Sequence, residues 1–148
     1  MLKKASLAAM LPHKKTDPER VKSIVDEMNQ SNVLHRPVAV YNLLHYGKKD
    51  TYLVVNGHHR IEALRTLGCA YVFASTIDFG EPFFKVFSQE GEKEWTKEEI
   101  INRAISGDLL EVDSTKMVVL VGDTYIPIQE NNAIEPKLEY KLKFLKGP

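Results

Sequence analysis

Apolar residues recur every three or four positions between residues 18 and 30, the spacing of one face of an α-helix. Thr16 and Asp17 precede this stretch as alternative N-cap residues, Pro18 suits the first turn, and Glu19 could close a capping box with Thr16. The pattern therefore predicts a helix over residues 18–30 that packs on a sheet. Its apolar face consists of Val21, Ile24, Val25 and Met28.

A second helix is predicted over residues 57–67, directly after a β-branched run. Its buried stripe is formed by Ile61, Leu64 and Leu67, and Gly68 suits a left-handed C-cap. The segments around it are apolar and rich in β-branched residues, which is typical of strands. Strands are predicted over residues 38–41, 51–55 and 71–79, with a hairpin loop at 44–50.

The rest of the chain alternates a third helix with short strand-like segments. Thr96 and Glu99 form a capping-box pattern ahead of an apolar stripe, and Gly107 follows it, so a helix is predicted over residues 97–106. Further strands are predicted within residues 2–11 and over residues 83–87 (a short edge strand), 116–121, 125–128 and 138–144. This order predicts an α/β (α+β) fold in which helices pack on a mixed sheet.

Composition limits the function classes. A chain of 148 residues fits one domain, and its 20 basic residues balance 20 acidic ones, so no overall field draws it to nucleic acid or an anionic membrane. The single cysteine, Cys69, excludes an intramolecular disulfide framework. No secretory signal or long apolar span is recognisable, so we expect a cytoplasmic protein without membrane association.

A candidate anion site lies where the predicted strand over 51–55 meets the second helix. Asn56, Gly57, His58, His59 and Arg60 follow one another there. The first backbone N–H groups of a helix have no intrahelical partner and lie at the positive end of its dipole, so they can hold a phosphate. Arg60 could add a bidentate guanidinium, and the histidines could donate hydrogen bonds. The alternative is an ordinary helix start capped by Asn56, with solvated histidines.

Two other kinds of chemistry are disfavoured. His58 and His59 are adjacent, and neighbouring residues of a helix point about 100° apart, so they cannot readily share a zinc ion. His13 and His35 add no recognisable ligand spacing, so no metal site is expected from histidine ligands. A Gly-x-Ser-x-Gly nucleophile motif is also absent from the sequence.

The order of these elements resembles the ParB/sulfiredoxin superfamily, and within it the free serine kinases are most similar. The resemblance rests on Leu11-Pro12-His13, the helix from Pro18, Arg36-Pro37 before a strand, and residues 54–64 with Leu67-Gly68. It implies a ParB/sulfiredoxin-like phosphate- or nucleotide-binding domain over residues 1–80. Residues 81–148 are then expected to form a helix plus strand-rich extension packed on that domain.

The resemblance also implies a ligand, a nucleotide polyphosphate held at the start of the second helix. The nucleotide is CTP in partition ParB proteins, ATP in sulfiredoxin, and ADP or ATP with Mg²⁺ in the serine kinases. Sulfiredoxins carry a catalytic cysteine where this chain has His58, so sulfiredoxin activity is not expected. Partition proteins continue into a helix-turn-helix, whereas residues 108–148 here resemble strands, which disfavours sequence-specific DNA binding.

Two residues depart from the serine kinase motifs. Pro-His-Glu, whose glutamate is the base in those kinases, corresponds here to Pro12-His13-Lys14, and Asp-Gly-His-His-Arg has Asn56 in place of aspartate. A protonated lysine cannot accept the proton of a hydroxyl, and an amide is a poorer Mg²⁺ ligand than a carboxylate. Either phosphoryl transfer is lost while anion binding remains, with Lys14 adding a cation, or another acid, Glu19 or Glu62, serves as base.

A second segment is faintly similar to the serine kinases. Ser114, Thr115 and Lys116 correspond to the start of their Thr-Thr-Arg-His motif, and their hydroxyls and cation could reach a phosphate. The alternative is an exposed turn that leads into a strand.

These observations favour a nucleotide-binding protein that is a divergent or inactive small-molecule kinase, with a nucleotide and a small hydroxyl-bearing metabolite as partners. One alternative is a ParB-like nucleic-acid-binding or nuclease module, in which Lys14, Lys15 and residues 58–60 would grip a backbone phosphate. Near-zero net charge disfavours it. Another alternative is a catalytically silent protein-interaction domain.

Overall fold

A five-stranded mixed sheet forms the centre of the computed structural model, which describes residues 1–147. The strands follow the order β1 (Leu2–Ser6), β6 (Tyr71–Thr76), β4 (Val38–Asn42), β5 (Tyr52–Asn56) and β2 (Met10–Leu11). Strands β1 and β6 pair antiparallel, and β4 is parallel to β6 but antiparallel to β5. The mixed α+β fold predicted from the sequence is confirmed.

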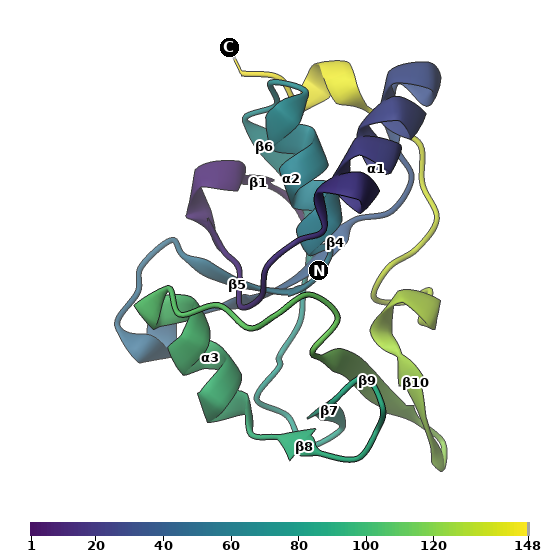
Figure 1. The fold of residues 1–148 in the computed structure, drawn as a ribbon. Helices are drawn as coiled ribbons and strands as arrows, with labels where there is room; N and C mark the ends of the chain where they lie inside the picture. The colour runs from purple at the N-terminus through teal and green to yellow at the C-terminus, as the bar shows by residue number, and fades with distance from the viewer. Residues whose placement is uncertain (148) are drawn as a thin grey trace.

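Side chains alternate between the two faces of this sheet, and both faces are buried. Val38, Val40 and Val54 face helices α1 (Pro18–Ser31) and α2 (His58–Thr66) in one apolar cluster. Ala39, Leu53 and Val55 face a second cluster that contains α3 (Lys97–Ser106). Figure 1 shows α1 and α2 side by side on one side of the sheet, with α3 on the other.

Local signals set the helix ends as predicted. The Asp17 side chain, not Thr16, accepts from the Glu19 amide and caps α1, while Thr96 and Glu99 form the expected capping box of α3. Gly68 and Gly107 follow their helices in the left-handed region, with φ of 78° and 76°. Helices α1 and α3 therefore begin at the predicted residues, and α2 lies within its predicted range.

A second, four-stranded sheet lies below the first in Figure 1. Its order is β10 (Thr124–Pro127), β9 (Lys116–Val121), β7 (Phe84–Phe87) and β8 (Glu94–Trp95). The strand predicted over residues 83–87 is present as β7, but its predicted place at a sheet edge is wrong, because β7 pairs with β9 on one side and with the two-residue strand β8 on the other.

The segment over 138–144 is mostly not a strand. Only β11 (Tyr140–Lys141) pairs, antiparallel to β3 (Val33–Leu34), and the chain then turns into the short 3₁₀ helix η4 (Leu142–Phe144). The predicted first strand is divided as well, into β1 and β2 with η1 (Leu7–Ala9) between them. The other 3₁₀ helices are η2 (Leu44–Tyr46) and η3 (Ile128–Glu130).

Residues 81–147 are integral to both apolar clusters. Phe84, Ile101 and Val119 contribute to the cluster on the α3 side, while Leu142 and Leu145 return to the cluster around α1 and α2. Within residues 1–147, no helix is both long and apolar enough to cross a lipid bilayer.

Candidate functional site

Gly57 lets the chain turn sharply from β5 into α2. Its φ is 113°, in the region that favours glycine, and a Cβ on this residue would lie 2.5 Å from Cγ1 of Val38. Gly57 rather than Asn56 is the N-cap, and in the described chain no side chain caps this helix. The first-turn N–H groups of His58, His59 and Arg60 therefore have no side-chain cap.

These N–H groups border a cavity of about 370 Å³. Most of the sequence-predicted site residues line it, together with residues that the sequence did not indicate. The predicted ones are Lys14, Asn56, Gly57, His58, His59, Arg60, Thr115 and Lys116, and the others include Arg20, Asp113, Gln89 and Gln129.

Lys14 reaches the cavity because its segment runs beside residue 110. The backbone of Leu110 accepts from the Lys15 N–H and donates to the His13 carbonyl, at 2.8 and 2.9 Å. The Lys14 ammonium then donates to the Thr115 carbonyl at 3.2 Å. Burial lowers the pKa of Lys14, and the nearby Asp113 carboxylate opposes that shift. This lysine is thus a partly buried cation on the cavity wall.

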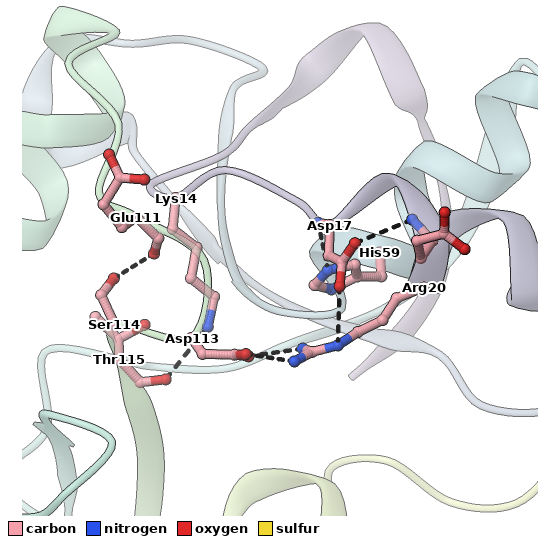
Figure 2. Close-up of polar contacts among 9 residues, drawn as sticks. Lys14, Asp17, Arg20, His59, Glu111, Asp113, Ser114 and Thr115 are labelled. Atoms are coloured by element: carbon pink, nitrogen blue, oxygen red, sulfur yellow. Dashed lines mark hydrogen bonds and ion pairs between the residues drawn. The ribbon is translucent and has the colours of Figure 1, made fainter.

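Arg20 and Asp113 form an ion pair across the cavity, which Figure 2 shows with both guanidinium NH₂ groups turned toward the carboxylate. Nη1 lies 2.6 Å from Oδ1, and Nη2 pairs with Oδ2. Hydrogen bonds from Arg20 lower the pKa of Asp113. No local pattern could have revealed this pair, because α1 carries the arginine and the turn before β9 carries the aspartate.

His13 and His58 belong to the core behind the cavity. The His13 ring contacts the Val54 carbonyl through Nδ1 at 2.9 Å and the Thr115 hydroxyl through Nε2 at 3.0 Å. Its backbone N–H donates to Nε2 of His58 at 3.2 Å. Burial lowers the pKa of His13 to about 3 and that of His58 well below its ordinary value, so both rings are neutral at pH 7.

The sequence analysis offered two interpretations of its histidines, hydrogen-bond donors to a phosphate or solvated side chains, whereas His13 and His58 are buried. His13 does not line the cavity, and its fully buried ring contacts the Thr115 hydroxyl, so its contact with a nucleotide stays a prediction. His58 borders the cavity but is also buried, not solvated.

Arg60 is tied to a carboxylate that the sequence did not indicate. Nη2 donates to Oε1 of Glu135 at 2.8 Å, and Nη1 donates to the Pro37 carbonyl at 2.6 Å. Oε2 of Glu135 accepts from the Asn56 amide at 2.6 Å, and this glutamate is fully buried. The guanidinium thus fixes the β5–α2 junction, and its contact with a phosphate stays a prediction.

The other predicted residues divide between cavity and surface. His59 lines the cavity, and its Nε2 accepts from the Asp17 N–H at 3.0 Å. Burial lowers the pKa of His59, and the positive charges of Arg20 and Lys14 lower it further. Ser114 is not brought to the cavity, because its hydroxyl donates to the Glu111 carbonyl at 2.6 Å, as Figure 2 shows. Lys116 is exposed at the cavity rim.

Neither candidate base from the sequence lies in this cavity. Glu19 is exposed on the first turn of α1 and outside the lining. Glu62 pairs with Arg65 at 2.5 Å and borders a different cavity. Asp113 is the acidic residue among the described residues that line the cavity at α2.

The residues that line this cavity could bind a metal ion only together with a phosphate-bearing ligand that supplies most of its contacts. Across residues 1–147, no group of three or more histidine, cysteine, aspartate or glutamate side chains is arranged to hold one. Mg²⁺ in phosphate sites is commonly bound through one or two carboxylates plus the phosphates themselves. The one carboxylate in the described lining, Asp113, is already paired through both oxygens with Arg20, so Mg²⁺ here would depend on the phosphates of the ligand.

The fold and this cavity place the chain among α+β proteins with helices packed on a mixed sheet and a cavity at a strand-to-helix junction. No protein-family model matches the chain. It is 36% identical over 70 residues, or 47% of its length, to an ATP-dependent L-serine kinase from Staphylothermus marinus. It spans only 27% of that relative's length.

Solved structures show the same fold over nearly the whole chain. A free serine kinase in complex with AMP superposes with a TM-score of 0.77 at 15% identity, covering 97% of this chain and 93% of the kinase. SbnI with a C-terminal truncation, from Staphylococcus aureus, gives 0.73 at 14% identity, covering 98% and 89%. The predicted likeness of the fold to that of the free serine kinases is thereby confirmed.

Proposed function

We propose that the protein is a kinase-like nucleotide-binding protein that holds the phosphates of ADP or ATP at the start of α2. The observation that carries this proposal is the uncapped first turn of α2, which opens onto a cavity lined by cations. Uncapped helical N–H groups and a positive dipole end form an anion site with little reorganisation.

The charges around the cavity support a polyanion. Arg20 is paired with Asp113, and Arg60 is paired with Glu135, so these four charges largely cancel. Lys14 and Lys116 add two further positive charges to the lining. A nucleoside diphosphate or triphosphate, which carries several negative charges, complements that excess together with the amides of α2.

An adjoining cavity of about 390 Å³ suits the rest of the nucleotide. It shares Lys14 and His58 with the first cavity, so the two cavities adjoin at these side chains. Apolar side chains form much of its wall and suit a nucleobase. They include Met10, Pro12, Val54, Ile61 and Leu109.

The relatives agree with this proposal. A mutant of the structurally similar free serine kinase is known in complex with ADP, and the curated relative is named as ATP-dependent. A compound that accepts the phosphoryl group could bind beside Lys14, where the two cavities meet. We therefore propose a small hydroxyl-bearing metabolite as the second substrate, with Mg²⁺ entering alongside the nucleotide.

Calorimetry with ATP, ADP and CTP, each with and without Mg²⁺, tests the binding proposal. We expect ATP or ADP to bind and Lys116→Ala to weaken binding about tenfold, which is about 1.4 kcal/mol, because it removes a cation from the rim. Lys48→Ala is the matched control, since Lys48 is also exposed but lies outside the cavity lining. No heat with any nucleotide from the folded protein would contradict the proposal, as would equal weakening by both variants.

A further inference from the structure

The cavity at the start of α2 combines an excess of cations with a single acidic side chain, Asp113, among its described lining residues. The inference drawn here rests on the proposed function and concerns how this site would act on a hydroxyl compound. Transfer of a phosphoryl group to a hydroxyl releases that hydroxyl's proton, so the site needs a group that orients the hydroxyl and accepts the proton.

The other basic groups near the cavity are already occupied. Nε2 of His58 accepts from the His13 N–H, and Nε2 of His59 accepts from the Asp17 N–H. Both oxygens of Glu135 accept hydrogen bonds, and the residue has no exposed surface. Neither histidine can take a proton at Nε2 without breaking its contact, and Glu135 has no exposed surface through which a ligand could reach it.

Asp113 differs from them in exposure and in geometry. Its side chain is 45% exposed, and Arg20 holds both carboxylate oxygens from one side. Each oxygen of a carboxylate has a second lone pair, so the bidentate contact leaves acceptor sites free. The carboxylate is also close enough to the Lys14 ammonium to affect it electrostatically, and Lys14 stands where the two cavities meet.

We propose that Asp113 is the proton acceptor for phosphoryl transfer from a nucleoside triphosphate to a small hydroxyl-bearing compound. The hydroxyl oxygen forms a bond with the terminal phosphorus, the bond between that phosphorus and the bridging oxygen breaks, and the nucleoside diphosphate leaves. The hydroxyl proton passes to the Asp113 carboxylate and then to solvent. Lys14 offsets negative charge on the phosphates beside it.

The ion pair with Arg20 is consistent with this role. Because Arg20 lowers the pKa of Asp113, the carboxylate is ionised at neutral pH and available as an acceptor. Phosphoryl transfer passes through a loose transition state in most enzymes, so orienting the hydroxyl matters more than a strongly basic carboxylate. Arg20 thus acts as a positioning residue that fixes the direction of the carboxylate.

Asp113→Asn tests the assignment in the full-length protein. Asp113 has a φ of 59°, and asparagine tolerates this left-handed conformation as aspartate does, so the variant changes charge without new backbone strain. Transfer of labelled terminal phosphate is measured with serine, threonine, homoserine, glycerol, ethanolamine and water as acceptors. We expect Asp113→Asn to lower the turnover number at least 100-fold, while the Kd for ATP stays unchanged or decreases.

Arg20→Gln distinguishes proton transfer from a structural ion pair, because it breaks the same pair but keeps the carboxylate. We expect it to lower turnover less than tenfold. Equal losses in Arg20→Gln and Asp113→Asn would overturn the assignment, and so would turnover within threefold of wild type in Asp113→Asn. A Kd for Mg²⁺-ATP that rises as much as turnover falls would instead make Asp113 a cation ligand.

The outcome also separates this inference from the proposed function. If wild-type protein binds ATP but transfers phosphate to none of the acceptors, the assignment of Asp113 fails while nucleotide binding stands. If no nucleotide binds, the proposed function itself fails. Circular dichroism and urea unfolding of each variant establish that a loss of turnover is not a loss of the fold.

Discussion

The buried histidines at positions 13 and 58 contribute to the fold through their neutral forms. His13 connects β5 to Thr115 through its two ring nitrogens, and the His58 ring accepts from the His13 backbone. Protonation would place a charge on a buried ring, and in His58 it would also remove the nitrogen lone pair that accepts from the His13 backbone N–H. Stability should therefore respond to pH in the range where free histidine titrates.

We expect the free energy of unfolding to fall as the pH is lowered from 7.5 to 5.5. The pKa of His13 is lowered to about 3 and that of His58 is lowered strongly, whereas in the unfolded chain both take up protons near 6.5. The unfolded state then binds more protons, so stability is complete above pH 6.5 and is lost progressively below it. Each histidine contributes about 1.4 kcal/mol per pH unit below 6.5.

Urea unfolding at pH 7.5, 6.5 and 5.5 measures this effect, which we expect to total about 2 to 3 kcal/mol for the two groups. His13→Gln should make the pH dependence shallower, whatever it does to stability at pH 7.5. A free energy of unfolding that does not change over this range would contradict the neutral, buried state of the two rings.

At the scale of elements, the junction between β5 and α2 depends on the absence of a side chain at residue 57. We expect Gly57→Ala to destabilise the protein by about 3 kcal/mol, because it combines a left-handed backbone with overpacking against Val38. Gly107→Ala is the matched control, since its φ is 76° but nothing lies within 4 Å of the added Cβ. It should cost only about 1 to 2 kcal/mol.

Urea unfolding of both variants separates the backbone term from the packing term. If Gly57→Ala were no more destabilising than Gly107→Ala, the contact with Val38 would not be what requires glycine at residue 57. We also expect Gly57→Ala to reduce nucleotide binding, because a shift at this residue moves the first turn of α2.

The sequence predicted those elements whose ends are set by neighbours in the chain. Asp17 and Thr96 cap helices through contacts within three residues, so α1 and α3 could be located closely. Residues 138–144 were predicted as a strand, but only two of them find a partner, and that partner is the short, distant strand β3. Periodicity cannot reveal how much of a segment finds a partner elsewhere in the fold.

In the candidate site, too, the sequence indicated residues that belong to local patterns and missed residues whose partners are distant in the chain. The motif over residues 56–60 and the cation Lys14 were identified, since they lie in recognisable local patterns. Asp113 and Glu135 lie in turns without such a pattern, and they were missed because their arginine partners are far away in the chain.

At the scale of the whole molecule, the two apolar clusters share the central sheet. Residues 1–80 were expected to form a domain on which residues 81–148 pack as an extension. In the described chain, several fully buried side chains of residues 1–80 pack in one apolar cluster with side chains of residues 81–147. These are Ala39, Leu43, Leu53, Val55 and Phe79.

We therefore expect a fragment of residues 1–80 to be unfolded or aggregated on its own. It would expose one face of its sheet and would lose Leu142 and Leu145 from the other. Circular dichroism and a urea titration of the fragment test this, with the full-length chain as reference. A soluble fragment with helical signal and a cooperative transition would show instead that the first part folds independently.

The bond between Glu135 and the β5–α2 junction has a consequence for the order of events during synthesis. The strand, the glycine and the first turn of α2 leave the ribosome long before Glu135, which ties Asn56 and Arg60 together. Until Glu135 emerges, Asn56 and Arg60 lack the carboxylate that joins them in the folded protein. A nascent chain should thus acquire its affinity for nucleotide only after Glu135 has emerged.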